Sequence, residues 1–360
     1  ADGYDGGLLP IAPYISFTRL FLENGTQDGR LRENLVSVPD KHWLRLLDVR
    51  YVMTDKTSDR WVDDILYDMQ FTTVISHGEV ISLAWLPEMY KADGMGIIYN
   101  GLDGYITVTF QNGKVERYQL PEMEQVLPHR IVWEENSPVV SIDLSTVSRP
   151  VTYSAISLIN TETASFYPLT LSDTYRLVHS GDVKIYEDTI PAQRASFVPG
   201  CQIVDSEIQA RQLLVGNPSM VYEAVLLDPL AAETCRQYGQ ERMDLDGQPA
   251  PSVIITDYQD LSVTLQGNSP VSGFILLSDA WYPGWEALLI PTAGGELGTV
   301  RGVPVLRANL MFRAVPVPAG EWALEIKYHP RYLWLGSVIS VVSVMLFAFY
   351  IYYWKRKKWY

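Results

Sequence analysis

Apolar and polar residues alternate with a period of two over most of the chain, in short runs that end at turn residues. In residues 322–328, WALEIKY, the even positions are apolar, whereas Glu325 and Lys327 occupy odd positions. Successive side chains of a strand point to opposite faces, so such runs predict strands with one buried face. The chain is therefore predicted to be mainly β with some α.

Two regions hold most of these runs. The first lies between 71 and 171 and contains Asn112-Gly113 between two alternating runs, which predicts a hairpin with a type I′ turn. The second extends from 261 to 328. Short strands separated by regular turns are typical of antiparallel sandwiches, so we expect two β-sandwich or jelly-roll-like modules.

Helical periodicity is found in shorter stretches. Residues 1 to about 68 are predicted to be mostly helical, with Asp40 as the N-cap of one helix and a further helix near Ser58 to Tyr67. Asp205 is predicted to cap another helix. In each case the cap side chain can accept a hydrogen bond from a free N–H of the first turn.

The stretch from Tyr332 to Trp354 follows neither pattern, because it contains no charged residue. At 1.5 Å per residue it spans roughly 34 Å as a helix, enough for the ~30 Å hydrocarbon core of a bilayer. A buried core helix is the alternative, but this stretch is long for one. We predict a transmembrane helix with Tyr and Trp at both interfaces.

Four basic residues follow this helix: Lys355, Arg356, Lys357 and Lys358. Positive residues favour the cytoplasmic side, so we expect a single-pass protein of the cell membrane with a cytoplasmic C-terminus and an extracytoplasmic N-terminal domain. Export of that domain needs a signal. Either a signal peptide was cleaved before Ala1, or the chain is the C-terminal part of a longer membrane protein.

Three small residues lie on one face of the predicted membrane helix, since Gly336 and Ser340 are four apart and Ser343 is three further along. Small residues let helices approach closely in a bilayer. We therefore expect the lipid bilayer and other membrane proteins as partners, the latter contacted through this helix and through the outer domain.

These patterns divide the chain into five parts. They are a helical or mixed segment of the membrane-proximal module at 1–70, a β-sandwich at 71–171 that is similar in outline to carbohydrate-binding sandwiches, an α+β region ending in a membrane-proximal sandwich at 172–330, the transmembrane helix at 332–354, and a basic tail at 355–360.

Charge excludes one class of partner. The chain has 28 Lys and Arg against 42 Asp and Glu, a formal net charge of -14. An acidic outer surface repels phosphate, so we expect no nucleic-acid partner.

The residues that often carry chemistry form no recognisable site. Cys201 and Cys235 could form a disulfide outside the cytoplasm, but a predicted helix and strand between them could also hold them apart, so the sequence leaves the bridge open. The five His residues are scattered, and adjacent acids such as Asp63-Asp64 are expected by chance in an acidic chain. We expect no catalytic residue, metal site or cofactor.

One aromatic group has two interpretations. Trp281, Tyr282 and Trp285 surround Pro283-Gly284 and could stack against a sugar ring, which makes carbohydrate a candidate ligand. The alternative is structural, because a Tyr-Pro-Gly-Trp turn joins two strands and its rings close the edge of a sandwich. The structural interpretation is the stronger of the two.

Several runs resemble the C-terminal region of bacterial YfhO-like membrane proteins. The most extensive is LLSDAWYPGWEA at 276–287. The matching runs, in chain order, are 3–5, 46–52, 183–187, 194–195, 276–287, 312–320 and 328–330, followed by the membrane helix. The resemblance covers 1–55 and 175–345, so the sandwich at 71–171 has the place of an insertion.

The resemblance implies a relation to GT-C glycosyltransferases, polytopic enzymes that take sugars from polyprenyl-phosphate donors. Their expected catalytic acid lies in an early loop that has no counterpart here, and this chain has one membrane helix where many are expected. Two hypotheses follow. The chain is a non-catalytic binding or scaffolding subunit for neighbouring membrane proteins, or it is the C-terminal part of a GT-C-type glycosyltransferase.

Overall fold

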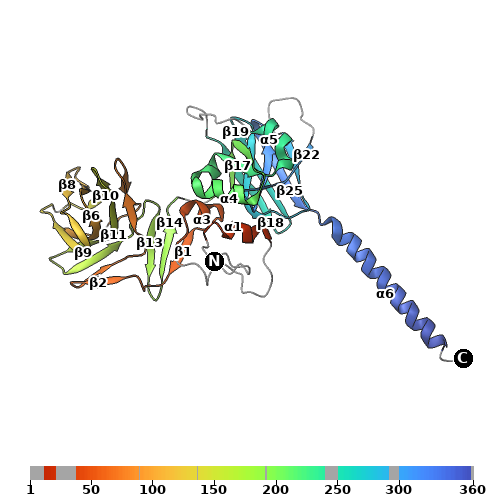
Figure 1. The fold of residues 1–360 in the computed structure, drawn as a ribbon, viewed down its shortest axis with the longest axis horizontal. Helices are drawn as coiled ribbons and strands as arrows, with labels where there is room; N and C mark the ends of the chain where they lie inside the picture. The colour runs from red at the N-terminus through yellow and green to blue at the C-terminus, as the bar shows by residue number, and fades with distance from the viewer. Residues whose placement is uncertain are drawn as a thin grey trace. The chain divides into compact units, whose positions relative to one another are not determined.

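The computed structural model describes residues 12–21, 38–88, 90–135, 137–190, 193–239, 250–291 and 300–357. The chain forms two compact units. The anchored unit consists of Ala1–Asp48 and Gln193–Tyr360, and the inserted unit, Val49–Ala192, lies between these segments in sequence. Both units are mainly β, as the alternating runs predicted, and Figure 1 shows their elements.

The inserted unit contains an antiparallel sandwich. One sheet has the strand order β5-β10-β7-β8 and the other β12-β11-β6-β9, with β4 also paired to β11. Ile106 and Ile142 from the first sheet and Met95 and Tyr153 from the second are fully buried between them. The strands are β4 (Thr73–Ile75), β5 (Val80–Ser82), β6 (Gly94–Gly101), β7 (Gly104–Phe110), β8 (Val115–Gln119), β9 (Met123–Val132), β10 (Val139–Thr146), β11 (Val151–Asn160) and β12 (Ser165–Leu169).

The inserted unit extends beyond the predicted 71–171 on both sides, because its remaining strands pair with one another. A three-stranded sheet has the order β1-β14-β13, in which Tyr51 pairs with Glu187. The residues just after 48 and just before 190 therefore belong to the same sheet. The bounds are β1 (Tyr51–Thr54), β13 (Tyr175–Ser180) and β14 (Lys184–Asp188).

The prediction of a helix near Ser58 to Tyr67 is wrong, because these residues form the hairpin β2 (Arg60–Val62) and β3 (Ile65–Tyr67). Val62 pairs with Ile65, and the two turn residues have φ angles of 50° at Asp63 and 63° at Asp64. Two positive φ angles define a type I′ turn. The apolar residues whose spacing suggested a helix lie on both strands of this hairpin, Trp61 on β2 and Ile65 and Leu66 on β3.

The turn at Asn112-Gly113 also differs from the prediction. The N–H of Gly113 donates to the carbonyl of Phe110 over 2.9 Å, and within this turn the positive φ, 84°, occurs at Gly113. This is a type I turn followed by a left-handed glycine, the usual three-residue hairpin loop. The hairpin of β7 and β8 itself is confirmed.

The anchored unit has three layers. A six-stranded sheet of order β15-β20-β24-β23-β17-β16 packs one face against a five-stranded sheet of order β18-β19-β25-β21-β22. Side chains along each strand alternate between the two faces of the sheet. Ile275 packs against the five-stranded sheet, and Phe274 packs in the core on the other face. The strands are β15 (Ala195–Val198), β16 (Gly200–Ile203), β17 (Ala224–Leu227), β18 (Ser252–Gln259), β19 (Ser262–Ser269), β20 (Gly273–Ala280), β21 (Trp285–Pro291), β22 (Arg301–Val303), β23 (Leu306–Ala308), β24 (Phe312–Val317) and β25 (Gly320–Tyr328).

Helices cover the outer face of the six-stranded sheet. Phe17 of α1 is fully buried and its ring centroid lies 4.9 Å from that of Phe312. The N-cap at Asp40 is confirmed, whereas the cap of α4 is Ser206 instead of Asp205, because Ser206 accepts from the N–H of Gln209. The helices are α1 (Ala12–Thr18), α3 (Lys41–Leu46), α4 (Glu207–Gly216) and α5 (Ala232–Tyr238), with short 3-10 turns η1 (Pro218–Tyr222) and η2 (Pro229–Ala231).

The last strand leads almost directly into the last helix. β25 ends at Tyr328, and α6 (Arg331–Lys357) begins after two residues (Figure 1). Residues Tyr332–Lys355 of α6 have a mean hydropathy of 2.1 and none of this segment is buried, so α6 is long and apolar enough to cross a membrane.

Candidate functional site

Asp279, near the end of β20, is the centre of an ionic cluster in the anchored unit. One carboxylate oxygen accepts from Arg194 Nη2 at 2.7 Å and from the Tyr258 hydroxyl at 2.9 Å. Arg313 Nη1 lies 3.5 Å from the other oxygen. Asp279 and Arg313 stand on the six-stranded sheet and Tyr258 on the five-stranded sheet, so the cluster joins the two sheets.

The charges of this cluster balance. Arg313 also donates from Nε to the carbonyl of Ala280, and its guanidinium carbon lies 3.6 Å from the ring centroid of Trp285. Arg194 Nη1 lies 3.5 Å from Asp48 Oδ2. Two arginines therefore face two aspartates. We call Asp48, Arg194, Tyr258, Asp279, Trp285 and Arg313 the Asp279 cluster.

Burial sets the electrostatics of the cluster. The side chains of Asp279 and Arg313 are only 6% and 10% exposed. Burial lowers the pKa of Arg313, although the nearby charge of Asp279 opposes that change. Burial and then the charge of Asp279 raise the pKa of Tyr258, so its hydroxyl remains a neutral donor. The ion pairs lie within the six-stranded sheet, and the Tyr258 hydroxyl and the Trp285 ring make the contacts from the other sheet.

The Asp279 cluster gathers residues that are far apart in sequence. Asp48, Arg194, Asp279, Trp285 and Arg313 come from four separate stretches of the chain. Sequence reasoning identified Trp285 and missed the charged members.

The aromatic residues proposed for sugar stacking have other contacts. The indole N–H of Trp281 donates to the carbonyl of Val305 over 3.0 Å, and one face of Trp285 is covered by the Arg313 guanidinium. Tyr282 is the exposed member of the three, at 52%. These contacts favour the structural interpretation, and sugar binding stays a prediction.

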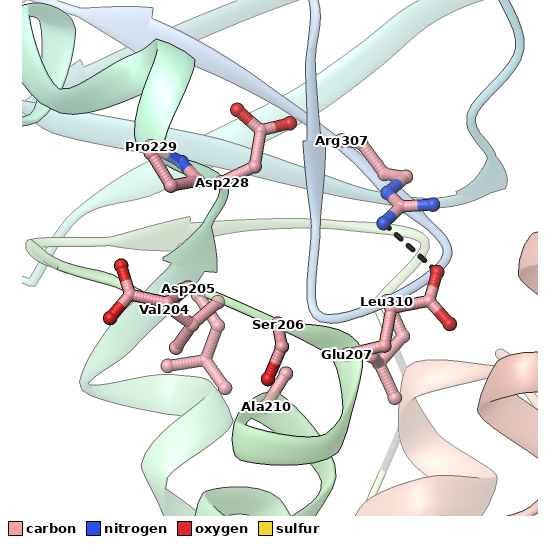
Figure 2. Close-up of a pocket in the computed structure, with 10 residues that line it drawn as sticks. Val204, Asp205, Ser206, Glu207, Ala210, Asp228, Pro229, Arg307 and Leu310 are labelled. Atoms are coloured by element: carbon pink, nitrogen blue, oxygen red, sulfur yellow. Dashed lines mark hydrogen bonds and ion pairs between the residues drawn. The ribbon is translucent and has the colours of Figure 1, made fainter.

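A pocket opens where two parallel strands end. β16 and β17 run parallel and are connected through α4, and the pocket of about 250 Å³ lies beyond their carboxyl ends, beside the N-terminus of α4. This is the position at which α/β sheets commonly bind ligands. Figure 2 shows the lining residues, which are Val204, Asp205, Ser206, Glu207, Ala210, Leu226, Asp228, Pro229, Arg307 and Leu310.

Several polar groups of this pocket already serve the fold. Glu207 accepts from Arg307 at 3.1 Å, drawn as a dashed line in Figure 2, and from Ser16 at 2.7 Å. Ser206 caps α4, and Asp228 caps η2 by accepting from the N–H of Leu230. The volume is also below the ~300–1,000 Å³ of typical small-molecule sites. The polar groups of the pocket are therefore better explained as helix caps and ion-pair partners than as a ligand site.

The two cysteines are bonded. Cys201 of β16 and Cys235 of α5 form a disulfide with a Cα–Cα distance of 5.8 Å. The chain between the two cysteines, which includes α4 and β17, folds back so that α5 lies beside β16. The expectation that these elements could hold the sulfurs apart is therefore wrong.

The inserted unit has two ionic clusters on the β1-β14-β13 sheet. Lys184, 1% exposed, pairs with Asp59 and with Asp68, the latter over 2.7 Å. Glu187 accepts from Arg176 and Arg50, and these hydrogen bonds, Arg176 first, hold the pKa of Glu187 below its ordinary value. The Lys184 cluster connects β14 to residues on either side of the β2–β3 hairpin, and the Glu187 cluster connects β14 to β13 and to the residue before β1.

The residues proposed for packing in the membrane lie on an exposed helix. The Ser340 hydroxyl donates to the Gly336 carbonyl and the Ser343 hydroxyl to the Ile339 carbonyl, each over 2.8 Å. A Cβ added at Gly336 would meet nothing within 4 Å. The small face is therefore available to a partner, and helix packing stays a prediction.

The basic residues at the end of α6 are described in part. Lys355 is exposed, and α6 ends at Lys357. Arg356 and Lys357 lie in the helix, and Lys358 lies outside the described residues. The orientation that they imply stays a prediction.

Comparisons with known proteins assign no family. No protein-family model matches the chain, and a comparison with curated proteins gives no match. Solved structures give faint similarities, and the three named here have TM-scores under 0.2. They include Bacillus subtilis oxalate decarboxylase (7% identity, 71% of this chain and 64% of that chain, TM-score 0.16), YhaK from Escherichia coli (8%, 81% and 99%, 0.17) and the Momordica charantia 7S globulin (10%, 77% and 79%, 0.15). This chain covers less than two thirds of the decarboxylase chain.

The decarboxylase contains Mn(II) centres, and that property belongs to the decarboxylase. In the part of this chain that the structure describes, no three His, Cys, Asp or Glu side chains lie close enough to hold a metal ion.

Proposed function

We propose that this chain is a single-pass membrane protein whose β-rich part is extracytoplasmic and acts as a non-catalytic binding or scaffolding subunit for neighbouring membrane proteins. One observation carries the proposal: two residues separate the last strand of the sandwich from an exposed helix that is long and apolar enough to cross a bilayer. A connection this short holds the sandwich at the membrane surface, where it can contact its neighbours.

The charged clusters support a scaffolding role. The Asp279 cluster joins two sheets through the Tyr258–Asp279 hydrogen bond and the Arg313–Trp285 cation–π contact, close to the strand that precedes α6. Such contacts resist sliding of the sheets, because moving one sheet past the other takes the Tyr258 donor from the buried Asp279 carboxylate and the Trp285 ring from the Arg313 guanidinium. A rigid sandwich on a short connection suits a protein that positions others.

A second candidate is the C-terminal part of a GT-C-type glycosyltransferase. The observation in its favour is that the runs resembling YfhO-like proteins converge on one cluster, as expected if they were inherited together. The coding sequence upstream of Ala1 separates the two candidates. Many further apolar spans would support the glycosyltransferase, and a signal peptide alone would support the subunit.

The scaffolding proposal is tested by crosslinking and co-purification from native membranes. We expect defined membrane partners to co-purify with the chain, and the double change Gly336→Leu and Ser340→Leu to remove those held through α6. The matched control is Val338→Leu with Val342→Leu, two exposed positions of α6 outside the small-residue face. Unchanged recovery of every partner with the first pair would contradict packing through this face.

Orientation is tested separately, with an introduced cysteine at Leu230. This residue is 96% exposed in the anchored unit, so a thiol there is accessible to reagent. A reagent that cannot cross the membrane should label it on intact cells or spheroplasts. Labelling that requires lysis would overturn the extracytoplasmic placement.

A further inference from the structure

The end of the sandwich beside α6 carries exposed apolar side chains on two loops. The N–H of Tyr328, the last residue of β25, donates to the carbonyl of Leu261 over 2.9 Å. The N–H of His329 donates to the carbonyl of Gly284 over 2.7 Å. Both the β18–β19 turn and the β20–β21 loop are therefore bonded to the residues that immediately precede α6.

The β20–β21 loop is built to lie against this connection. Gly284 has a φ of 112°, and a Cβ there would come within 2.9 Å of the His329 carbonyl oxygen, so only glycine permits this close approach. The Tyr328 ring centroid lies 5.3 Å from that of Trp285 and 6.4 Å from that of Tyr282. The aromatic residues of the loop thus gather around the last strand residue.

The two loop tips point apolar groups outward. Leu261 is 60% exposed and Tyr282 is 52% exposed. We call Leu261, Tyr282 and Tyr328 the end patch. At most roughly 3.6 Å of chain per residue separates Tyr328 from Arg331, so the patch lies within about 10–15 Å of the start of α6 whatever direction the helix takes.

The charged side chains near the end patch indicate which kind of lipid headgroup it would contact. Asp260 is exposed beside Leu261. The basic Lys327 is paired with Glu325 at 2.6 Å, and His329 lies 3.3 Å from Glu286. The described side chains here therefore give no excess of positive charge, and anionic lipid headgroups would not be preferred.

We infer that the end patch enters the headgroup region of the bilayer and holds the sandwich upright on the membrane. Tyr side chains are enriched in this region, where the ring is apolar and the hydroxyl remains hydrated, and a Leu beside it adds apolar area. The occupant of the patch is a zwitterionic lipid surface, bound without salt dependence. This inference rests on the proposed membrane anchorage, and it assigns the exposed Tyr282 a contact with lipid instead of with sugar.

The test uses single introduced cysteines in the full chain, in nanodiscs of phosphatidylcholine. The two native cysteines are bonded to each other, so an introduced cysteine is the only free thiol. The test positions are Tyr282→Cys and Leu261→Cys. The matched control is Ile254→Cys, 62% exposed on β18, where Ile254, Gln266 and Ala323 are aligned across three strands. Tyr328 lies five positions after Ala323, so the control lies roughly 17 Å further along the strands. Val344→Cys, in the middle of α6, reports the anchorage itself.

Each cysteine carries an environment-sensitive fluorophore and is exposed to aqueous iodide and to lipids with a headgroup nitroxide. Labels at the end patch should be quenched by the nitroxide, with iodide quenching several-fold weaker than at the control and unchanged by salt or by added phosphatidylserine. Equal iodide quenching at the end patch and at the control, with a protected label at Val344, would overturn the inference and leave the anchorage standing. Free access of iodide to Val344 would overturn the anchorage and the inference with it.

Discussion

Replacing Asp279 with Asn should destabilise the anchored unit more than any other single charge removal in it. Asp279 faces Arg194 and Arg313, and Asn keeps its shape while removing the negative charge. Arg313, 10% exposed, would then be a buried cation that has lost the ionic partner it has among the described residues. The loss should appear as a lower free energy of unfolding.

The magnitude follows from burial. Removing one partner of a buried pair costs about 3–5 kcal/mol. We expect about 3 kcal/mol, the lower end of the range for a buried pair, because Arg194 is 38% exposed and solvent screens it. For a unit of this size each kcal/mol lowers Tm by about 2–4 °C, so the expected fall is roughly 6–12 °C.

The assay is thermal unfolding of the full chain in detergent micelles, followed by tryptophan fluorescence. The control is Asp260→Asn, an exposed acid in the same unit, which should change the free energy of unfolding by less than about 0.5 kcal/mol. The combined change Asp279→Asn with Arg313→Met should recover part of the lost Tm, because it removes the unpaired cation and keeps an apolar group against Trp285. No recovery in the double variant would refute the reasoning, since the loss could not then arise from an unpaired charge.

Three further predictions concern the covalent and ionic links. Reducing the Cys201–Cys235 disulfide, which closes a loop with a sequence separation of 34, should destabilise the anchored unit by about 4 kcal/mol in denaturant titrations, and a double alanine variant should lose its response to reductant. Lys184→Met should cost the inserted unit about 3–5 kcal/mol, because it leaves two facing aspartates without a cation, whereas Lys114→Met at an exposed pair should cost under about 1 kcal/mol. The folded-state pKa of Glu187 is depressed below 4.5, so its stabilisation is present above that pH and is lost as pH falls through the folded-state pKa. Tm measured from neutral pH into this acid range should fall less in Glu187→Gln, and equal falls in both chains would contradict the assignment.

Features that depend on neighbouring residues could be predicted from the sequence. The alternation of WALEIKY fixes one buried face, and Trp322, Leu324 and Ile326 are indeed at most 1% exposed. The apolar run of α6 and the cap at Asp40 are equally local. In each case the pattern and the structure depend on the same few residues.

The Asp279 cluster could not be predicted in this way. Arg194, Asp279 and Arg313 are far apart in sequence and meet because β15, β20 and β24 are neighbours in one sheet. No spacing rule gives that order of strands. The disulfide has the same origin, since nothing local to Cys201 indicates that α5 returns to β16.

At the Asp63-Asp64 turn the apolar spacing and the backbone conformation point to different structures, and the difference can be tested. Helical spacing of apolar residues favoured a helix, but Asp64 has a φ of 63°, a left-handed conformation that costs an L-residue about 1–2 kcal/mol and glycine almost nothing. Asp64→Gly should therefore raise the stability of the inserted unit by about 1 kcal/mol, whereas glycine inside a helix would lower it by a similar amount. Asp64→Ala removes the same charge but keeps the Cβ, so it separates backbone conformation from electrostatics and should not stabilise. Thermal unfolding of the three chains decides by sign: a lower Tm for the glycine variant than for the parent would mean that these residues do not form the hairpin turn.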